Sequence, residues 1–98
     1  MKIVLENNNY ELIKNYKDAF NYDEISNLYT DYFYSYDYIL GDYAYNKLRL
    51  KGFCKKENPI FNDINDYSII DNYIKENCAY DCKYFIIKRV YMISLYLL

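Results

Sequence analysis

The chain has 98 residues, a formal net charge of −2, and neither histidine nor tryptophan. This length fits one small domain, and the charge predicts no long-range attraction to nucleic acid or to an anionic membrane. Without histidine there is no imidazole base for a serine or cysteine nucleophile, and the sequence has no phosphate-binding glycine loop. We therefore expect a non-catalytic protein with no cofactor.

Aromatic residues dominate the composition, with 16 tyrosines and 5 phenylalanines. Each ring can bury on the order of 150–250 Å², which suits a chain that must build its core from few residues. Tyrosine, asparagine, lysine and isoleucine all have AT-rich codons. We therefore interpret the tyrosine excess as genomic drift and not as a platform for bases or sugars.

The amino-terminal segment predicts a cytoplasmic location. Its short apolar run meets Glu6 and an asparagine tract before a signal-peptide core could form. Nowhere does an apolar stretch approach the roughly 18 residues of a membrane span, so we expect no membrane association. In the cytoplasm, the three cysteines are expected to remain thiols.

The first half of the chain predicts a hairpin and a helix. Residues 2–5 and 9–14 have strand character, and the asparagines at 7–9 favour a turn between them. Asn21 and Glu24 form a capping-box pattern for a helix over 23–33. The apolar residues of this segment fall at helical spacing and predict one core face: Ile25, Leu28, Tyr29, Tyr32 and Phe33.

The second half predicts a second hairpin, a helix and a final strand. Residues 36–40 and 46–53 form the strands of a hairpin about Gly41 and Asp42, with a turn longer than two residues. Ser68 and Asp71 can cap a helix, and a last strand covers 83–89. The expected fold is α+β, one antiparallel or mixed sheet of about five strands with two helices, in the order ββαββαβ.

Three motifs resemble one known family. The segment 10–21 ends in Asp18-Ala19-Phe20-Asn21, the segment 41–45 has the sequence Gly-Asp-Tyr-Ala-Tyr, and 78–85 has the spacing Cys-x-x-x-Cys-x-Tyr-Phe. Together they resemble the YutD-like family of small bacterial proteins, whose turn motifs carry glycine where this chain has Ala19 and Ala44. The resemblance implies one domain over 1–90 and raises the question of how the two alanines are accommodated.

A basic stripe is the main candidate for a binding surface. Period-two alternation places Lys47, Arg49 and Lys51 on one face of a strand, while Leu48 and Leu50 enter the core. The candidate binding residues are Asp42, Tyr43, Tyr45, Lys47, Arg49 and Lys51.

This surface has three interpretations. It could bind a protein partner, with the chain acting as an adaptor or regulator. It could hold RNA or the ribosome through phosphates and stacked bases. It could also be a solvated strand face whose arginine pairs with Asp37 or Asp42.

Cys78 and Cys82 are interpreted as structural residues, packed under the second helix and the last strand. Zinc would need four ligands, and the chain adds only Cys54 and carboxylates such as Asp81, so we predict no metal site. A redox pair remains the alternative. The apolar extension 91–98 is expected to pack on the domain or at an interface, such as that of a homodimer.

Overall fold

The structure, a computed structural model, describes residues 1–78 and 81–91. Its strands are β1 (Lys2–Leu5), β2 (Asn8–Tyr16), β3 (Tyr38–Ala44), β4 (Lys47–Phe53) and β5 (Tyr84–Val90). Its helices are α1 (Tyr22–Leu28) and α2 (Ile70–Asn77), with short 3-10 turns η1 (Asp31–Phe33) and η2 (Tyr67–Ile69). All four strand pairings are antiparallel. The predicted α+β fold and its element order are confirmed.

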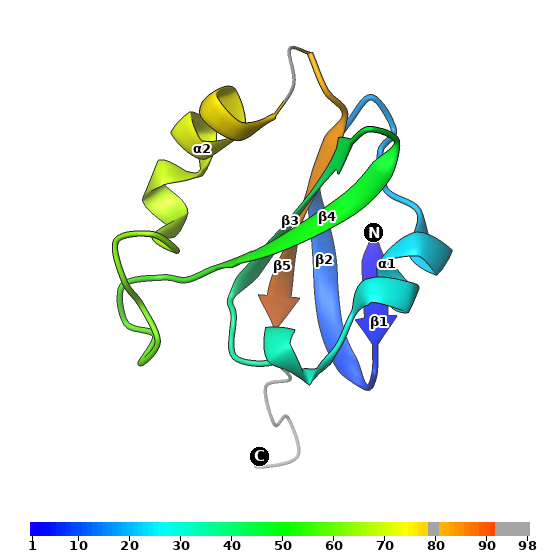
Figure 1. Ribbon diagram of the computed structural model, residues 1–98. Helices are drawn as coiled ribbons and strands as arrows, with labels where there is room; N and C mark the ends of the chain where they lie inside the picture. The colour runs from blue at the N-terminus through cyan, green and yellow to red at the C-terminus, as the bar shows by residue number, and fades with distance from the viewer. Residues whose placement is uncertain (79–80, 92–98) are drawn as a thin grey trace.

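The five strands lie in the order β1-β2-β5-β3-β4, so β5 joins two hairpins that are separate in the sequence. Figure 1 shows the sheet between α1 and α2. Phe85 and Ile87 of β5 belong to a core cluster with Ile25 of α1, whereas Ile86 belongs to a second cluster with Ile70 of α2. The alternation of one central strand therefore fills two cores on opposite faces of the sheet.

The first hairpin turns at Glu6 and Asn7, whose φ angles are 48° and 67°. Two consecutive left-handed residues form the turn that matches the twist of paired strands. The asparagine tract thus predicts the right place, although β2 already begins at Asn8.

The predicted helix over 23–33 is wrong in its second half. Asn21 caps α1 as expected, because its Oδ1 accepts a hydrogen bond from the Glu24 amide at 3.0 Å. The helix ends at Leu28, however, and Tyr29 is already extended. Leu28 is therefore 45% exposed, whereas Tyr29 and Phe33 still reach the core through the irregular backbone.

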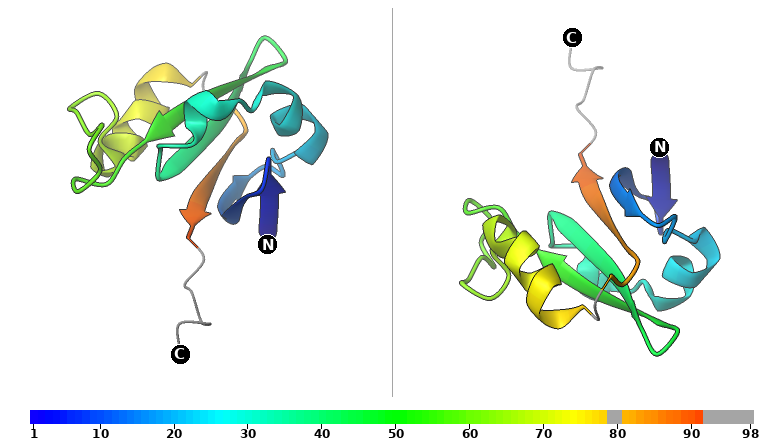
Figure 2. Two further views of the ribbon diagram at one scale, coloured as in Figure 1. Left: turned by 90° about the horizontal axis from the view of Figure 1, so that it is seen from below. Right: turned by 90° about the horizontal axis from the view of Figure 1, so that it is seen from above.

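The predicted turn at Gly41 and Asp42 is also wrong. Both residues lie within β3, paired with Leu50 and Arg49 of β4, and the chain reverses at Tyr45 and Asn46. A β-carbon on Gly41 would lie 2.2 Å from the ring of Phe85. This glycine therefore serves close packing and not a turn. Figure 2 shows the tip of the β3–β4 hairpin projecting from the molecule.

The two alanines that replace family glycines cause no backbone strain. Neither Ala19 nor Ala44 is among the described residues with positive φ. The left-handed positions fall on their neighbours instead, at Lys17 and Asp18 before Ala19 and at Tyr45 and Asn46 after Ala44.

Polar side chains organise the connection between β4 and α2. Asp37 accepts hydrogen bonds from the Lys55 amide and from Asn58 Nδ2, at 2.8 and 3.0 Å. Asn65 is 5% exposed and donates from Nδ2 to the Ile60 carbonyl. The predicted cap at Ser68 is wrong, because Asp66 caps η2 two residues earlier by accepting from the Ser68 amide.

Within the described residues, no helix has the length and apolar character needed to cross a membrane. The predicted packing of segment 91–98 concerns residues that, apart from Tyr91, lie outside the described ones.

Two substitutions in α1 test where the helix faces the core. Ile25 is fully buried, so Ile25→Asp should lower the free energy of unfolding by several kcal/mol or prevent folding. Leu28→Asp should change it by less than about 1 kcal/mol, because this side chain is partly in water. Urea denaturation followed by circular dichroism compares the two, and equal losses would contradict the observed end of the helix.

Candidate functional site

A pocket of about 470 Å³ lies along the outer edge of β4. Arg49 and Lys51 line it from one face of the strand, and Leu50 lines it from the other. Leu40 and Asp42 of β3 also line it, so the pocket extends from the edge of β4 over the face of the sheet that packs on α2. Its walls are three tyrosines and the connection after β4, namely Tyr32, Tyr36, Tyr73, Asn62, Ile64 and Asn65.

Asp42 and Arg49 form the polar centre of this region. They face each other across β3 and β4, and Arg49 donates to both carboxylate oxygens at 2.9 and 2.6 Å. The Asp42 side chain is 6% exposed and that of Arg49 is 48% exposed. The hydrogen bonds to Asp42 raise the pKa of Arg49. Because the carboxylate is buried, this pair is more than a surface salt bridge.

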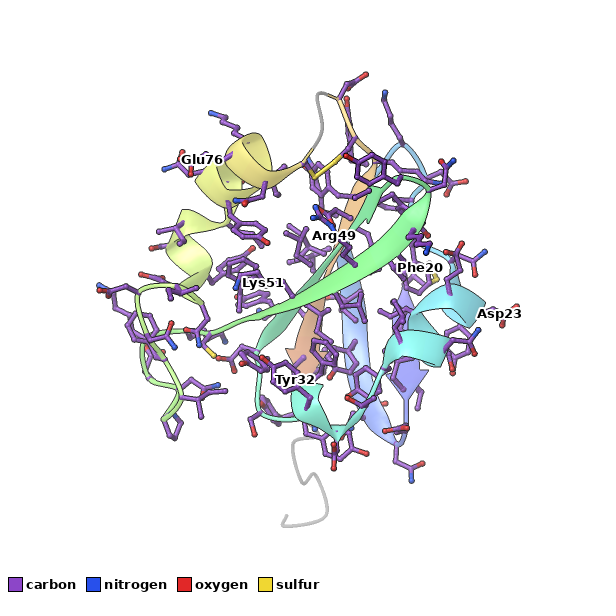
Figure 3. All side chains as sticks on the ribbon, viewed as in Figure 1. Phe20, Asp23, Tyr32, Arg49, Lys51 and Glu76 are labelled. Atoms are coloured by element: carbon purple, nitrogen blue, oxygen red, sulfur yellow. A yellow bond between two sulfur atoms is a disulfide. The ribbon has the colours of Figure 1, made fainter. Side chains whose placement is uncertain are left out.

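The same arginine ties the hairpin to the end of α2. Its Nη2 atom donates to the carbonyl oxygen of Asn77 at 3.1 Å. A helix carbonyl in the last turn lacks an intrahelical donor, so the guanidinium satisfies a group that would otherwise need water. Figure 3 shows Arg49 and Lys51 on the side of β4 that faces α2.

The structure brings together three of the six predicted binding residues. Asp42, Arg49 and Lys51 line the pocket. The Nζ atom of Lys51 lies over the rings of Phe53 and Tyr73, 5.2 and 5.3 Å from their centroids. The faces of the two rings attract the ammonium group.

The other three predicted residues lie elsewhere on the hairpin. Tyr43 is paired with Leu48 and packs on the opposite side of the sheet, against the α1 core. Tyr45 is 99% exposed at the hairpin tip, and Lys47 is exposed beside it. The candidate residues therefore form a pocket group and a tip group.

Sequence reasoning missed the tyrosine wall of the pocket. Tyr32 and Tyr36 share a hydrogen bond between their hydroxyl groups, 3.1 Å apart, which raises the pKa of Tyr36 to about 12. The Tyr36 hydroxyl thus stays protonated at neutral pH. Helical spacing assigned Tyr32 to the core, and only the early end of α1 reveals its place at the pocket.

The expectation of three free thiols is wrong for two cysteines. A disulfide joins Cys78 at the end of α2 to Cys82 before β5, and Cys54 is the free, buried cysteine. Asp81 has a left-handed φ of 58° within the closing turn, and the two Cα atoms lie 5.9 Å apart, within the range that a disulfide spans. Two of the three cysteines that were expected to remain thiols are therefore paired.

Cys78 also touches the buried carboxylate, with its Sγ atom 3.2 Å from Asp42 Oδ2. A thiol here can donate to Asp42, whereas a disulfide sulfur has no proton. The donor atoms of Asp42, Cys78 and Cys82 lie within 4.8 Å of one another. This set offers three of the four ligands of a structural zinc site, and Arg49 already occupies the carboxylate, so the described residues fit a metal poorly.

Known proteins resemble this chain over nearly its full length. The model of a family described as "Putative antitoxin YutD-like" matches residues 4–88. "Putative antitoxin YutD" of Bacillus subtilis strain 168 is 41% identical over 88 residues, which cover 90% of this chain and 97% of that protein. The solution structure of protein yutD from B. subtilis superposes with a TM-score of 0.78 at 38% identity, covering 96% of this chain and 86% of the other.

Removing Arg49 should destabilise the fold. Arg49→Ala leaves the buried Asp42 carboxylate without its two guanidinium donors, and the free energy of unfolding should fall by about 1–3 kcal/mol. The matched control, Lys47→Ala, removes an exposed cation of the same strand and should cost less than about 0.5 kcal/mol. Urea denaturation measures both. An Arg49→Ala protein as stable as the control would show that the pair contributes nothing.

The disulfide makes a separate prediction about thiol counts. Under denaturing conditions, iodoacetamide should label one of the three cysteines before reduction and all three afterwards. Reduction should also lower the free energy of unfolding by about 2 kcal/mol, the value expected for a loop this short. A Cys78→Ala, Cys82→Ala variant should not respond to reductant. Three labelled cysteines in protein prepared without reductant would contradict the pairing.

Proposed function

Since this chain belongs to the YutD-like family, we propose that it is a non-catalytic cytoplasmic regulator that acts as an antitoxin, by binding and restraining a partner protein. The relative from B. subtilis carries the name of an antitoxin, and an antitoxin works by neutralising another molecule. The proposal needs a recognition surface and no catalytic group.

The observation that carries the proposal is the exposed β3–β4 hairpin. Its tip presents Tyr45, which is 99% exposed, next to Lys47, on a strand pair that the Asp42–Arg49 pair and β5 hold in place. Tyrosine is among the residue types that contribute most to protein interfaces, because a rigid ring buries a large area at small entropic cost. A rigid support with an exposed aromatic tip favours recognition of a protein.

The RNA or ribosome alternative has weaker support. Of the three cations in the stripe, Arg49 is engaged by Asp42, and Lys51 lies over two aromatic rings. Lys47 is exposed at the tip, and the Arg49 side chain is 48% exposed. Phosphate binding strengthens with the number of cations that reach the phosphates, and the whole chain carries a net charge of −2, so three cations on one strand are a small footprint for a nucleic-acid backbone.

A capture experiment in the native host tests the function. The epitope-tagged chain, purified with nuclease, should recover one specific protein, and the Tyr45→Ala, Lys47→Ala variant should recover it at least about tenfold less. The matched control, Ile13→Ala with Lys14→Ala, removes an exposed apolar residue and a lysine from β2 and should behave as the unmodified chain. The melting temperatures of both variants should lie within a few degrees of that of the unmodified chain.

Growth provides the second measurement. Depleting the chain should arrest growth, and re-expressing the unmodified chain, but not the tip variant, should restore it. Deleting the gene of the captured protein should remove the arrest. Unchanged growth on depletion, or material that nuclease releases completely, would contradict an antitoxin that acts on a protein.

A further inference from the structure

The outer edge of β4 is open to another strand. β4 is the last strand in the sheet order, and on its outer side no strand of residues 1–78 and 81–91 pairs with it. The backbone groups along such an edge can pair with an extended chain. The pocket opens beside Arg49, Leu50 and Lys51, whereas Gly52 is buried against the ring of Tyr36, so the accessible part of this edge is residues 47–51.

An extended segment of the chain itself already pairs with the residue that follows β4. The Cys54 amide donates to the Asn65 carbonyl at 2.7 Å, and the Tyr67 amide donates to the Cys54 carbonyl at 2.9 Å. Cys54 and Asp66 thereby form a parallel bridge. The pocket begins next to this bridge, because Asn62, Ile64 and Asn65 line it. A bound strand would continue pairing that the chain itself begins.

The charges along β4 indicate what this strand must carry. Lys47, Arg49 and Lys51 project on one face at every second residue, a spacing of about 6.6 Å that matches alternate side chains of a strand laid beside it. Arg49 is half exposed although it holds Asp42. Acidic side chains at alternate positions would meet these cations, while the remaining positions would meet Leu50 and the tyrosine wall.

We propose that the outer edge of β4 binds an extended, acidic segment of the partner protein by strand addition. The proposal rests on the proposed function in so far as the partner is a protein. A second copy of this chain is a poor occupant, because antiparallel pairing of β4 with β4 would set the cations of one copy against those of the other.

A synthetic peptide tests the binding mode directly. The probe is the blocked heptapeptide Glu-Val-Glu-Val-Glu-Val-Glu, titrated into the full chain and followed by amide chemical shifts and hydrogen exchange. Shifts should concentrate in residues 47–53 and 62–65, and exchange of β4 amides should slow. The same peptide with proline in place of valine should have no effect, because proline cannot donate to a ladder.

Two variants locate the site. Lys51→Glu should weaken the peptide about tenfold, whereas Lys2→Glu on β1, the other edge of the sheet, should leave it unchanged. Lys51→Gln, which removes the charge without reversing it, should give an intermediate loss and guards against a folding defect in Lys51→Glu. Shifts confined to β1, equal effects of both charge reversals, or a peptide-induced dimer seen by light scattering would overturn the proposal.

The outcomes separate the binding mode from the function. Host capture that is lost in the tip variant but insensitive to Lys51→Glu, with no peptide binding, would leave the antitoxin function standing and overturn strand addition. Peptide binding at β4 without any captured host protein would leave strand addition standing and overturn the function.

Discussion

The ring of Phe85 lies against the backbone of Gly41, with no room for even a β-carbon between them. Gly41 thus leaves room for the ring over β3, at one of the five positions where β3 and β5 pair. Because β5 also pairs with β2, the two hairpins become one sheet only through this central strand. The close approach at Gly41 also sets the position of its neighbour Asp42, and through Asp42 that of Arg49 and the end of α2.

The candidate site is thus a product of the core. Asp42 follows the glycine that packs under Phe85, and its carboxylate is buried beneath Arg49 and Cys78. A buried carboxylate needs donors, and the cross-strand arginine supplies two while reaching the Asn77 carbonyl. The disulfide fixes Cys78 against the same carboxylate. The β3–β4 hairpin and the distant end of α2 meet at this ion pair, which orders the inner wall of the pocket.

The sequence predicted correctly those elements that depend on contacts between neighbouring residues. The Asn21 cap, the alternation in β4 and the apolar run of β5 are properties of a few neighbouring residues, and each gave the right element. Long-range contacts decided the rest. A glycine followed by an aspartate is typical of a turn. The position needs a glycine, however, because the ring of Phe85, 44 positions further along the chain, leaves no room for a side chain. Leu28 fits a helical stripe, yet the helix ends there because Tyr29 and Phe33 reach the core from extended and 3-10 backbone. Tyr32 and Tyr36 line the pocket because α1 ends at Leu28, and helical periodicity could not predict that end.

The central place of the last strand also has a consequence for synthesis. During translation, β1 pairs with β2 and β3 pairs with β4 from nearby segments, but the edges that β5 will fill on β2 and β3 stay open until residues 84–90 emerge. At about 5–20 residues per second, this interval lasts roughly a few seconds after β4 is made. Neighbouring nascent chains on one messenger carry the same open edges and the same missing strand. These edges therefore stay exposed to misassembly until β5 has emerged from the ribosome.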